Sequence, residues 1–292
     1  MKAKPNCIAC AMKQARIIMD KNNVEKSKQV KLEDEIYNIL FNMDSELTPG
    51  HYFSEILFYL SKTLGIADFY LEDKRKHNHQ AMGLLPMLNS FLDKSSERLL
   101  TALLLSAAGN IIDLGISNTF NLEKNIEKCL REGFEIDDYK TFKSDLLSAS
   151  NLLLIADNAG EIVFDKLLIE QIQIYSQRHG NDRLDIKVMV KDKPVLNDAT
   201  MQDAIEINLT NTCDVITTQC NYIGAPLELI GPNALNSFNE ADIIIAKGQG
   251  NYETLGEEKS LHNRLYILLQ AKCQVIANSL NVDRMKTIFK KM

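Results

Sequence analysis

Two acidic residues and an amide stand beyond the ends of two apolar runs in the sequence. Asp157 and Asn158 directly follow the run from Leu152 to Ala156, and Asp198 follows the run from Ile186 to Val190 after a short polar loop. Carboxylate and amide oxygens are the ligands that Mg²⁺ and similar hard divalent cations prefer. Because only two carboxylates are present, such a cation would keep positions for water and for a phosphate oxygen.

A third apolar run, from Ile243 to Ala246, is followed by a lysine and a glycine-containing segment. Lys247 offers a point charge for a phosphate, and Gly248 and Gly250 allow backbone N–H groups to approach its oxygens. Asn251 follows in the same loop. The three loops together predict a combined metal and phosphate site.

Each loop also has a purely structural interpretation. Asn158 and Glu161 have the spacing of a capping box, so Asn158 could simply begin a helix. Asn197 and Asp198 follow a proline, which is typical of a turn. The chemical interpretation gains its strength from the three loops taken together.

The elements that must position these residues are predicted from apolar periodicity. Short apolar runs in the second half predict strands buried on both faces of a mostly parallel sheet. These runs are 152–156, 186–190, 214–218 and 243–246, with one or two more at 266–269 and 274–277. The intervening helical patterns, clearest from Gly160 to Gln177, predict an α/β/α arrangement of three layers. In such sheets, ligands bind beyond the carboxyl ends of the strands.

The first half of the chain shows apolar residues at helical spacing and few strand signals. Helices are expected at 10–21, 32–42, 53–64, 70–92, 96–116, 123–131 and 139–148. The chain is therefore predicted to consist of a helical lobe, residues 1–148, and an α/β/α metal- and phosphate-binding lobe, residues 149–292. The segment from Lys74 to His77 is interpreted as a solvated helix face.

Size and composition agree with a globular enzyme or binding protein. The chain has 292 residues, 45% of them apolar and 25% charged, with a formal net charge of −6. The negative charge argues against a nucleic-acid partner, and the most apolar helix candidate carries Ser106, Asn110 and Asp113, which argues against a membrane span. No secretion signal is visible at the N-terminus, so we expect a cytoplasmic protein. The oligomeric state is left open.

Six cysteines occur, and two of them form a C-x-x-C motif at Cys7 and Cys10. A tetrahedral zinc site needs two more ligands, which Cys213, Cys220 or Cys273 could supply. Reduced, buried thiols are the alternative.

The ordered set of segments resembles the damage-control phosphatases, the ARMT-like family of metal-dependent phosphatases. The matching segments are Ala156–Glu161 with Asp165, Pro194–Thr200, Ile245–Glu253, Asp73–Asn78 and Ala108–Asp113. Cys7 and Cys10 with Gln14 resemble the opening of the cysteine-bearing, mainly prokaryotic branch.

The resemblance implies a helical lobe packed on an α/β/α lobe and hydrolysis of phosphate monoesters, such as sugar phosphates or damaged metabolites. It implies a divalent cation (Mg²⁺, Mn²⁺, Co²⁺ or Ni²⁺) held by Asp157, Asn158 and Asp198, and a phosphate contact from Lys247. It further implies that the substrate site is lined by Asn110, Asp113, Glu161 and Asn251, and that Lys74 or Asn78 could reach it.

Two questions of chemistry stay open at this point. Asp157 or Glu161 could orient an attacking water, or Asp157 could itself form an aspartyl-phosphate. The other function classes are an S-adenosylmethionine-dependent carboxyl methyltransferase and a non-catalytic protein that binds phosphorylated metabolites. The methyltransferase fold usually needs a glycine-rich loop after its first strand, and here that loop has one glycine, Gly160.

Overall fold

The computed structural model describes residues 1–109 and 119–292. Within these residues, seven strands form one sheet in the order β1-β7-β6-β5-β2-β3-β4. They are β1 (Ile136–Asp137), β2 (Asn151–Ile155), β3 (Asp185–Val190), β4 (Asp214–Thr217), β5 (Ile243–Lys247), β6 (Leu265–Gln270) and β7 (Thr287–Lys291). All neighbours pair in parallel except β6 and β7, which are antiparallel.

Thirteen α-helices and two short 3₁₀ helices occur in the described part of the chain. The helices before β2 are α1 (Pro5–Lys21), α2 (Lys26–Phe41), α3 (Pro49–Leu64), α4 (Leu71–Gly83), α5 (Leu85–Lys94), α6 (Arg98–Ala108), α7 (Thr119–Glu132) and α8 (Tyr139–Ser148). Those after β2 are α9 (Glu161–Arg178), α10 (Met201–Glu206), η2 (Leu209–Asn211), α11 (Pro232–Glu240), α12 (Gly248–Leu255), η3 (Lys259–Leu261) and α13 (Gln274–Leu280).

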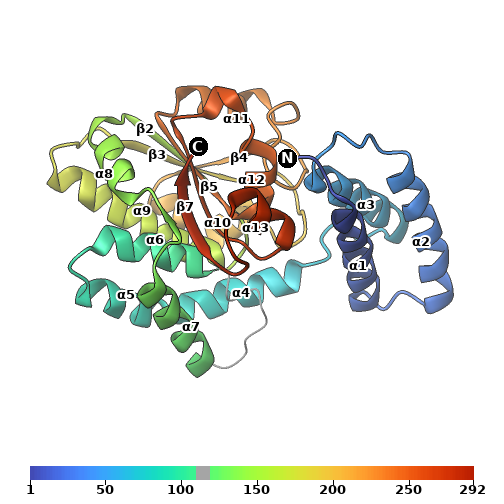
Figure 1. Cartoon of the computed structure of the whole chain (residues 1–292). Coiled ribbons are helices and arrows are strands. Elements are labelled where there is room, and N and C mark those ends of the chain that lie inside the picture. The colour runs from blue at the N-terminus through green and yellow to red at the C-terminus, as the bar shows by residue number, and fades with distance from the viewer. Residues whose placement is uncertain (110–118) are drawn as a thin grey trace.

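The central strand β2 explains why the sheet is covered on both sides. Leu152 and Leu154 pack into the apolar cluster on one face, and Leu153 and Ile155 pack into the cluster on the other. Successive side chains of a strand point to opposite faces, so a continuous apolar run requires cover on each. Helices α4 to α10 contribute to the first cluster and α11 to α13 to the second (Figure 1).

Helices α1, α2 and α3 have an apolar core of their own and lie to one side of the sheet (Figure 1). Val195, from the loop after β3, inserts into that core. The Tyr222 hydroxyl donates to Glu55 at 2.7 Å, and the Ile223 N–H donates to Ser54 at 2.9 Å. These contacts join α3 to the loops at the carboxyl edge of the sheet. The lobe boundary at residue 148 stays a prediction.

The predicted fold class is confirmed, because a mostly helical first half precedes a mostly parallel sheet with helices. The helix expected at 70–92 is two helices, α4 and α5, because Pro86 lies in the first turn of α5 and cannot donate a backbone hydrogen bond there. Of the helix expected at 96–116, α6 is present as far as Ala108, and residues 110–116 lie outside the described residues.

Two strand predictions at the C-terminal end of the chain need correction. The apolar run 274–277 is helix α13, which Cys273 caps by accepting the Ile276 N–H at 3.4 Å. The last strand is β7, which the sequence analysis missed together with the two-residue β1.

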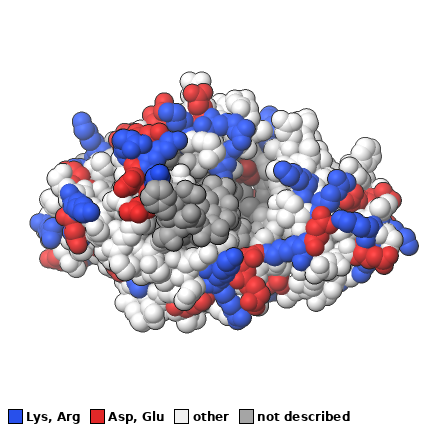
Figure 2. All heavy atoms as spheres, turned by 90° about the horizontal axis from the view of Figure 1, so that it is seen from below, with Lys and Arg blue, Asp and Glu red and all other residues white. Residues whose placement is uncertain are grey.

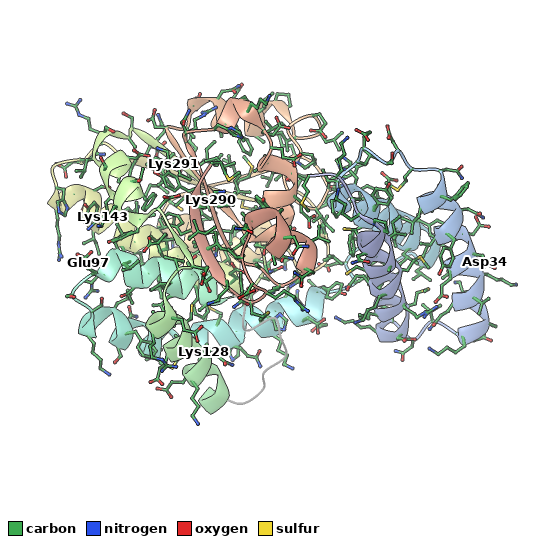
Figure 3. The ribbon with its side chains drawn as sticks, viewed as in Figure 1. Asp34, Glu97, Lys128, Lys143, Lys290 and Lys291 are labelled. Carbon is green, nitrogen blue, oxygen red and sulfur yellow. The ribbon has the colours of Figure 1, made fainter. Side chains whose placement is uncertain are left out.

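Charged side chains of both signs are interspersed over the surface seen in Figure 2. Figure 3 shows Asp34 on α2, at the side of the molecule away from the sheet, and Lys290 and Lys291 on β7. In the described part of the chain, no helix is both long and apolar enough to cross a membrane.

An aromatic cluster attaches α8 to the two antiparallel strands. Phe142 of α8 lies edge-on to Tyr266 of β6 and Phe289 of β7, with ring centroids 5.2 Å apart in both pairs. Phe142→Ala is expected to lower the free energy of unfolding by about 3–5 kcal/mol, because it leaves a cavity in a fully buried site. Urea unfolding followed by circular dichroism measures this loss.

The control is Leu147→Ala on the same helix, since Leu147 is 47% exposed. We expect this variant to change the free energy of unfolding by less than about 1 kcal/mol. Equal effects of the two substitutions would contradict the anchoring role of Phe142.

Candidate active site

The structure brings the three predicted loops together at the carboxyl edge of the sheet. β2 pairs with β3 on one side and with β5 on the other, so their carboxyl ends adjoin. The Ala159 N–H donates to the Asn197 carbonyl at 2.9 Å, and the Ala199 N–H donates to the Asp157 carbonyl at 2.8 Å. The two loops therefore run side by side, with Asn158 opposite Asp198.

Asn158 does not cap the helix that follows it. The N-cap of α9 is Gly160, with φ +79°, and the helix begins at Glu161. The Asn158 amide lies 3.1 Å from Asp157 Oδ2 and 3.5 Å from Glu161 Oε2. The capping-box interpretation is therefore wrong, because the chain makes a further turn before the helix starts. The Asn158 side chain instead lies among the acidic groups.

Lys247 is the last residue of β5, and its side chain is fully buried. Its Nζ donates to Glu161 Oε1 at 2.5 Å, to Asp165 Oδ1 at 2.7 Å, and to the hydroxyl and carbonyl of Ser106 at 2.8 and 2.9 Å. An ammonium group has only three donors, so protein oxygens already occupy all of them. Lys247 thus links β5 to α6 and α9.

The pKa values in this network reflect the balance between burial and charge. Burial alone would lower the pKa of Lys247, but Asp165 and Glu161 together outweigh it and raise that pKa. Burial raises the pKa of Glu161, and the neighbouring Lys247 opposes that rise. The ammonium is therefore charged because carboxylates surround it.

Gly248 allows Asp157 to approach the first turn of α12. A Cβ at residue 248 would lie 1.9 Å from Asp157 Oδ2, and Gly248 has φ +76°. Any other residue at position 248 would therefore have to displace the Asp157 carboxylate. It would also have to adopt a left-handed backbone conformation, which is unfavourable for residues with a Cβ. Gly250 packs instead against Ile223 and Gly224, so it supports the neighbouring loop.

Asn251 joins the ends of the two central strands from inside the site. Its amide nitrogen donates to the Ala156 carbonyl at 3.1 Å and to the Lys247 carbonyl at 2.7 Å. Its Oδ1 is buried and has no hydrogen-bond partner among the described residues. Asn251 therefore fixes the separation of β2 and β5 where Asp157 emerges.

Two buried groups near these loops were not selected as site residues from the pattern of the strand ends. The first is Lys191, which follows β3 directly. Its Nζ donates to the carbonyls of Tyr222, at 3.1 Å, and Gly224. The same Nζ lies 3.6 Å from Asp198 Oδ2. Its place directly after a predicted strand is the signal that could have identified it.

The second is Asn78 of α4, which the family resemblance only suggested. Its Oδ1 accepts the Gly160 N–H at 2.7 Å, and its amide donates to Asp203 at 2.9 Å and Glu206 at 3.0 Å. Asn78 thus connects the loop after β2, which carries Asp157, to α10 through hydrogen bonds. The solvated-face interpretation is wrong for Lys74, which is buried beside Asp68 at 2.8 Å.

Asn110 and Asp113, both expected to line the site, lie outside the described residues. The last described residue before them, Gly109, lies against Glu161 and Phe164, since a Cβ at residue 109 would come within 3.1 Å of both side chains. Gly109 itself therefore lies beside Glu161 of the acidic cluster.

The donor set fits a hard divalent cation. Burial of the Asp157 carboxyl group raises its pKa well above its usual range, and the charges of Glu161 and Asp198 raise it further. Asp157, Asn158 and Asp198 combine two carboxylates with an amide, and a bound cation would offset the repulsion between the acidic groups.

The cysteines do not form an alternative metal centre in the described part of the chain. Among residues 1–109 and 119–292, no three His, Cys, Asp or Glu side chains are arranged to hold a metal ion together. Burial raises the pKa of the Cys7 and Cys10 thiols, which disfavours the thiolate that zinc would need.

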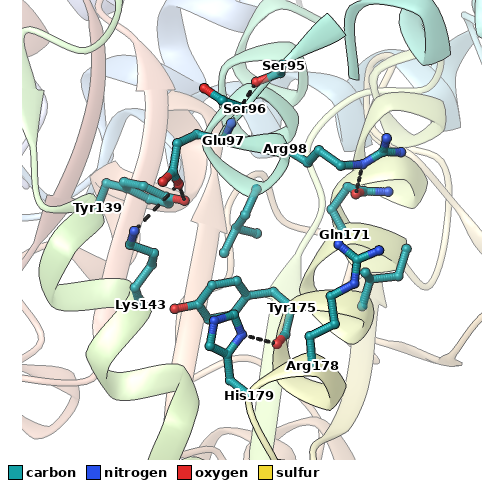
Figure 4. Close-up of a pocket in the computed structure, with 12 residues that line it drawn as sticks. Ser95, Ser96, Glu97, Arg98, Tyr139, Lys143, Gln171, Tyr175, Arg178 and His179 are labelled. Carbon is teal, nitrogen blue, oxygen red and sulfur yellow. Dashed lines mark hydrogen bonds and ion pairs between the residues drawn. The ribbon is translucent and has the colours of Figure 1, made fainter. Parts of the chain in front are cut away.

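A pocket of about 440 Å³ lies away from this site (Figure 4). It is lined by Arg98 at the start of α6 and by Tyr175, Arg178 and His179 at the end of α9, whereas the acidic cluster lies at the beginning of α9. Its polar groups are largely paired with one another, as Arg98 with Gln171 at 3.1 Å. The pocket is therefore separate from the three loops at the carboxyl edge of the sheet.

Replacement of Lys247 tests the buried ion network. Lys247→Met leaves Glu161 and Asp165 buried without their cation, so we expect a loss of about 3–5 kcal/mol in the free energy of unfolding. The two carboxyl groups would then bind protons more tightly in the folded state than in the unfolded state. Stability of the variant should therefore fall as pH rises, and the deficit should be larger at pH 8 than at pH 5.

Urea unfolding at both pH values measures this effect, with Lys187→Met as the control. Lys187 pairs with Glu240 at 3.5 Å on the surface, and such pairs contribute about 0–1 kcal/mol. A pH-independent loss of the same size in both variants would show that the network is not ionic in origin.

The chain is similar to known proteins along nearly its whole length. The sequence model of the Damage-control phosphatase ARMT1-like domain matches residues 3–288. A damage-control phosphatase of Pyrococcus horikoshii is 32% identical over 288 residues, covering 97% of this chain and 96% of the relative. An uncharacterized protein of Methanocaldococcus jannaschii is 35% identical over 290 residues, covering 97% and 93%.

The crystal structure of a DUF89 family protein from Pyrococcus horikoshii has the same fold. It superposes with a TM-score of 0.91 at 31% identity and covers 100% of this chain and 99% of that chain. The shared length, the sequence identity and the fold agree, and the chain therefore belongs to the damage-control phosphatase ARMT1-like family.

Proposed function

We propose that this protein is a metal-dependent phosphatase that hydrolyses phosphate monoesters of small metabolites, such as sugar phosphates or damaged phospho-metabolites. The observation that carries the proposal is the cluster of Asp157, Asn158 and Asp198 beside the first turn of α12. The names of the relatives support phosphatase activity in metabolite repair.

Asp157, Asn158 and Asp198 would hold the divalent cation, with Mg²⁺, Mn²⁺, Co²⁺ and Ni²⁺ as the candidates. When bound, such a cation neutralises charge on phosphoryl oxygens and lowers the pKa of a coordinated water. The backbone N–H groups at the start of α12 supply partial positive charge at the same place. The site thus combines the two kinds of charge stabilisation on which phosphoryl transfer depends.

The remaining residues hold the donors in place. Asn78 and Asn251 fix the backbone around Asp157 through the Gly160 N–H and the Ala156 carbonyl. Glu161 is held by Lys247 on one oxygen and faces Asn158 with the other. Because these supports are buried hydrogen bonds, the acidic cluster is organised before substrate binds.

The carboxyl methyltransferase alternative receives less support. The loop after β2 directs Asp157 and Asn158 into the edge of the sheet, whereas a nucleotide-type cofactor needs glycines that let it approach the backbone. The family and the names of its members also favour phosphate hydrolysis.

Substitution of the acidic residues tests the proposal. Asp157→Asn and Asp198→Asn should each reduce phosphate release by about 1,000-fold or more, because several kcal/mol of transition-state stabilisation are lost. The assay screens phosphorylated sugars and cofactor intermediates with Mg²⁺, Mn²⁺ or Co²⁺ and after treatment with a chelator. Wild-type protein should lose activity with the chelator and regain it when the metal is restored.

Asp192→Asn is the matched control. Asp192 lies in the same loop as Asp198 but is exposed and bonded to Thr217 at 3.1 Å, so activity should be unchanged. Full activity of Asp157→Asn or Asp198→Asn would disprove the assigned site. No phosphate release by wild-type protein with any metal would favour a non-catalytic metabolite-binding protein.

A further inference from the structure

The pocket at the C-terminal end of helix α9 carries an unmatched positive charge. It is the cavity of about 440 Å³ in Figure 4, and its charged lining residues are Glu97, Arg98, Lys143 and Arg178. Lys143 Nζ lies 3.5 Å from Glu97 Oε2, and Arg98 Nη1 lies 2.8 Å from Asp93 Oδ1. The Arg178 guanidinium has neither an ion pair nor a hydrogen bond within the described part of the chain. The pocket is therefore electropositive in a protein whose net charge is −6.

Hydrogen-bond donors at this place are only partly used. Gln171 is 5% exposed, and its Oε1 accepts from Arg98 Nε at 3.1 Å, but its amide nitrogen donates to none of the described residues. Arg98 uses Nη1 for Asp93, which leaves Nη2 without a partner among residues 1–109 and 119–292. In Figure 4 the Gln171 side chain lies between those of Arg98 and Arg178. Since buried polar groups are normally paired, these donors lack an acceptor that a ligand would supply.

Two guanidinium groups and an amide suit an oxyanion. Guanidinium N–H groups form paired hydrogen bonds with phosphate or carboxylate oxygens, and such charge-assisted bonds are among the strongest in proteins. A phosphate monoester dianion has three terminal oxygens, so it can accept from Arg98, Gln171 and Arg178 together. The carboxylate in the pocket does not compete, because Glu97 already accepts the Tyr139 hydroxyl at 2.9 Å and faces Lys143.

The rest of the pocket suits a flat organic group. Tyr175 and His179 stack with ring centroids 4.1 Å apart, and Leu99 and Ile174 also line the cavity. An aromatic base packs well on such a surface. The volume of about 440 Å³ is far larger than one phosphate group needs, and it lies within the range of about 300–1,000 Å³ that is typical of small-molecule sites.

We propose that this pocket binds a nucleoside monophosphate, with the phosphate on Arg98, Gln171 and Arg178 and the base against Tyr175 and His179. This site is separate from the proposed phosphatase site and does not depend on that function. The acidic cluster lies at the first turn of α9 and the pocket at the last turn, about 25 Å apart for 18 residues that rise about 1.5 Å each.

Binding of a phosphonate analogue of AMP, measured by isothermal titration calorimetry, tests the proposal. Its P–C bond resists a phosphatase, so wild-type protein can be used. Arg178→Gln should raise Kd about 10- to 100-fold, the loss expected for a charge-assisted hydrogen bond. Gln171→Glu keeps the acceptor for Arg98 but places a negative charge beside the phosphate, so it should abolish measurable binding. Arg178 is exposed, so its replacement should leave folding intact.

Two control variants separate the pocket from other causes. Arg183→Gln removes the same charge from the exposed turn between α9 and β3, outside the pocket lining, and should leave Kd unchanged. Asp157→Asn should also keep the wild-type Kd, because the acidic cluster lies at the other end of α9.

Inorganic phosphate and adenosine distinguish the two parts of the ligand. Phosphate should compete with the analogue, whereas adenosine, which has no charge for the guanidinium groups, should not bind measurably. The proposal is wrong if wild-type protein does not bind the analogue, or if Arg178→Gln and Gln171→Glu bind it with wild-type affinity. Binding that is lost in Asp157→Asn but kept in Gln171→Glu would place the nucleotide at the acidic cluster and would equally overturn the proposal.

Discussion

The arrangement at the carboxyl edge of the sheet depends on the buried ammonium group of Lys247. Removing such a charge from water costs several kcal/mol unless oxygens surround it, so β5 can end in a buried lysine only if α6 and α9 approach it. Ser106 arrives from α6, and Glu161 and Asp165 arrive from successive turns of α9. The same contacts determine where α9 begins, and therefore where Asn158 and Glu161 lie.

A second constraint is the lack of space around Asp157. Its carboxylate occupies the volume that a side chain on Gly248 would need, and Gly160 turns with positive φ against His77 of α4. These close approaches place the carboxylate at the start of a helix, where backbone N–H groups favour negative charge. Gly248 therefore serves two purposes. It leaves space for the Asp157 carboxylate, and it lets that carboxylate lie at the N-terminus of α12.

The strands that carry the site were predictable because β2, β3 and β5 are central strands, and burial on both faces makes each a short apolar run. The run 274–277 is equally apolar but belongs to α13, in which Ile276, Ala277 and Leu280 are buried on one face. Four apolar residues cannot distinguish a strand from a short helix. β1 was missed since it has only two residues, and its pairing partner β7 is far away in the sequence.

The sequence by itself determined which chemical groups stand at the strand ends, since residue type and order along the chain suffice to place Asp157, Asn158, Asp198 and Lys247 there. It could not determine how each group is used. Asn158 and Glu161 have the spacing of a capping box, yet an extra turn at Gly160 sends the Asn158 amide towards the acidic groups. Only the tertiary structure decided that Lys247 is enclosed by carboxylates, because the neighbours of that lysine come from elements that are distant in the chain.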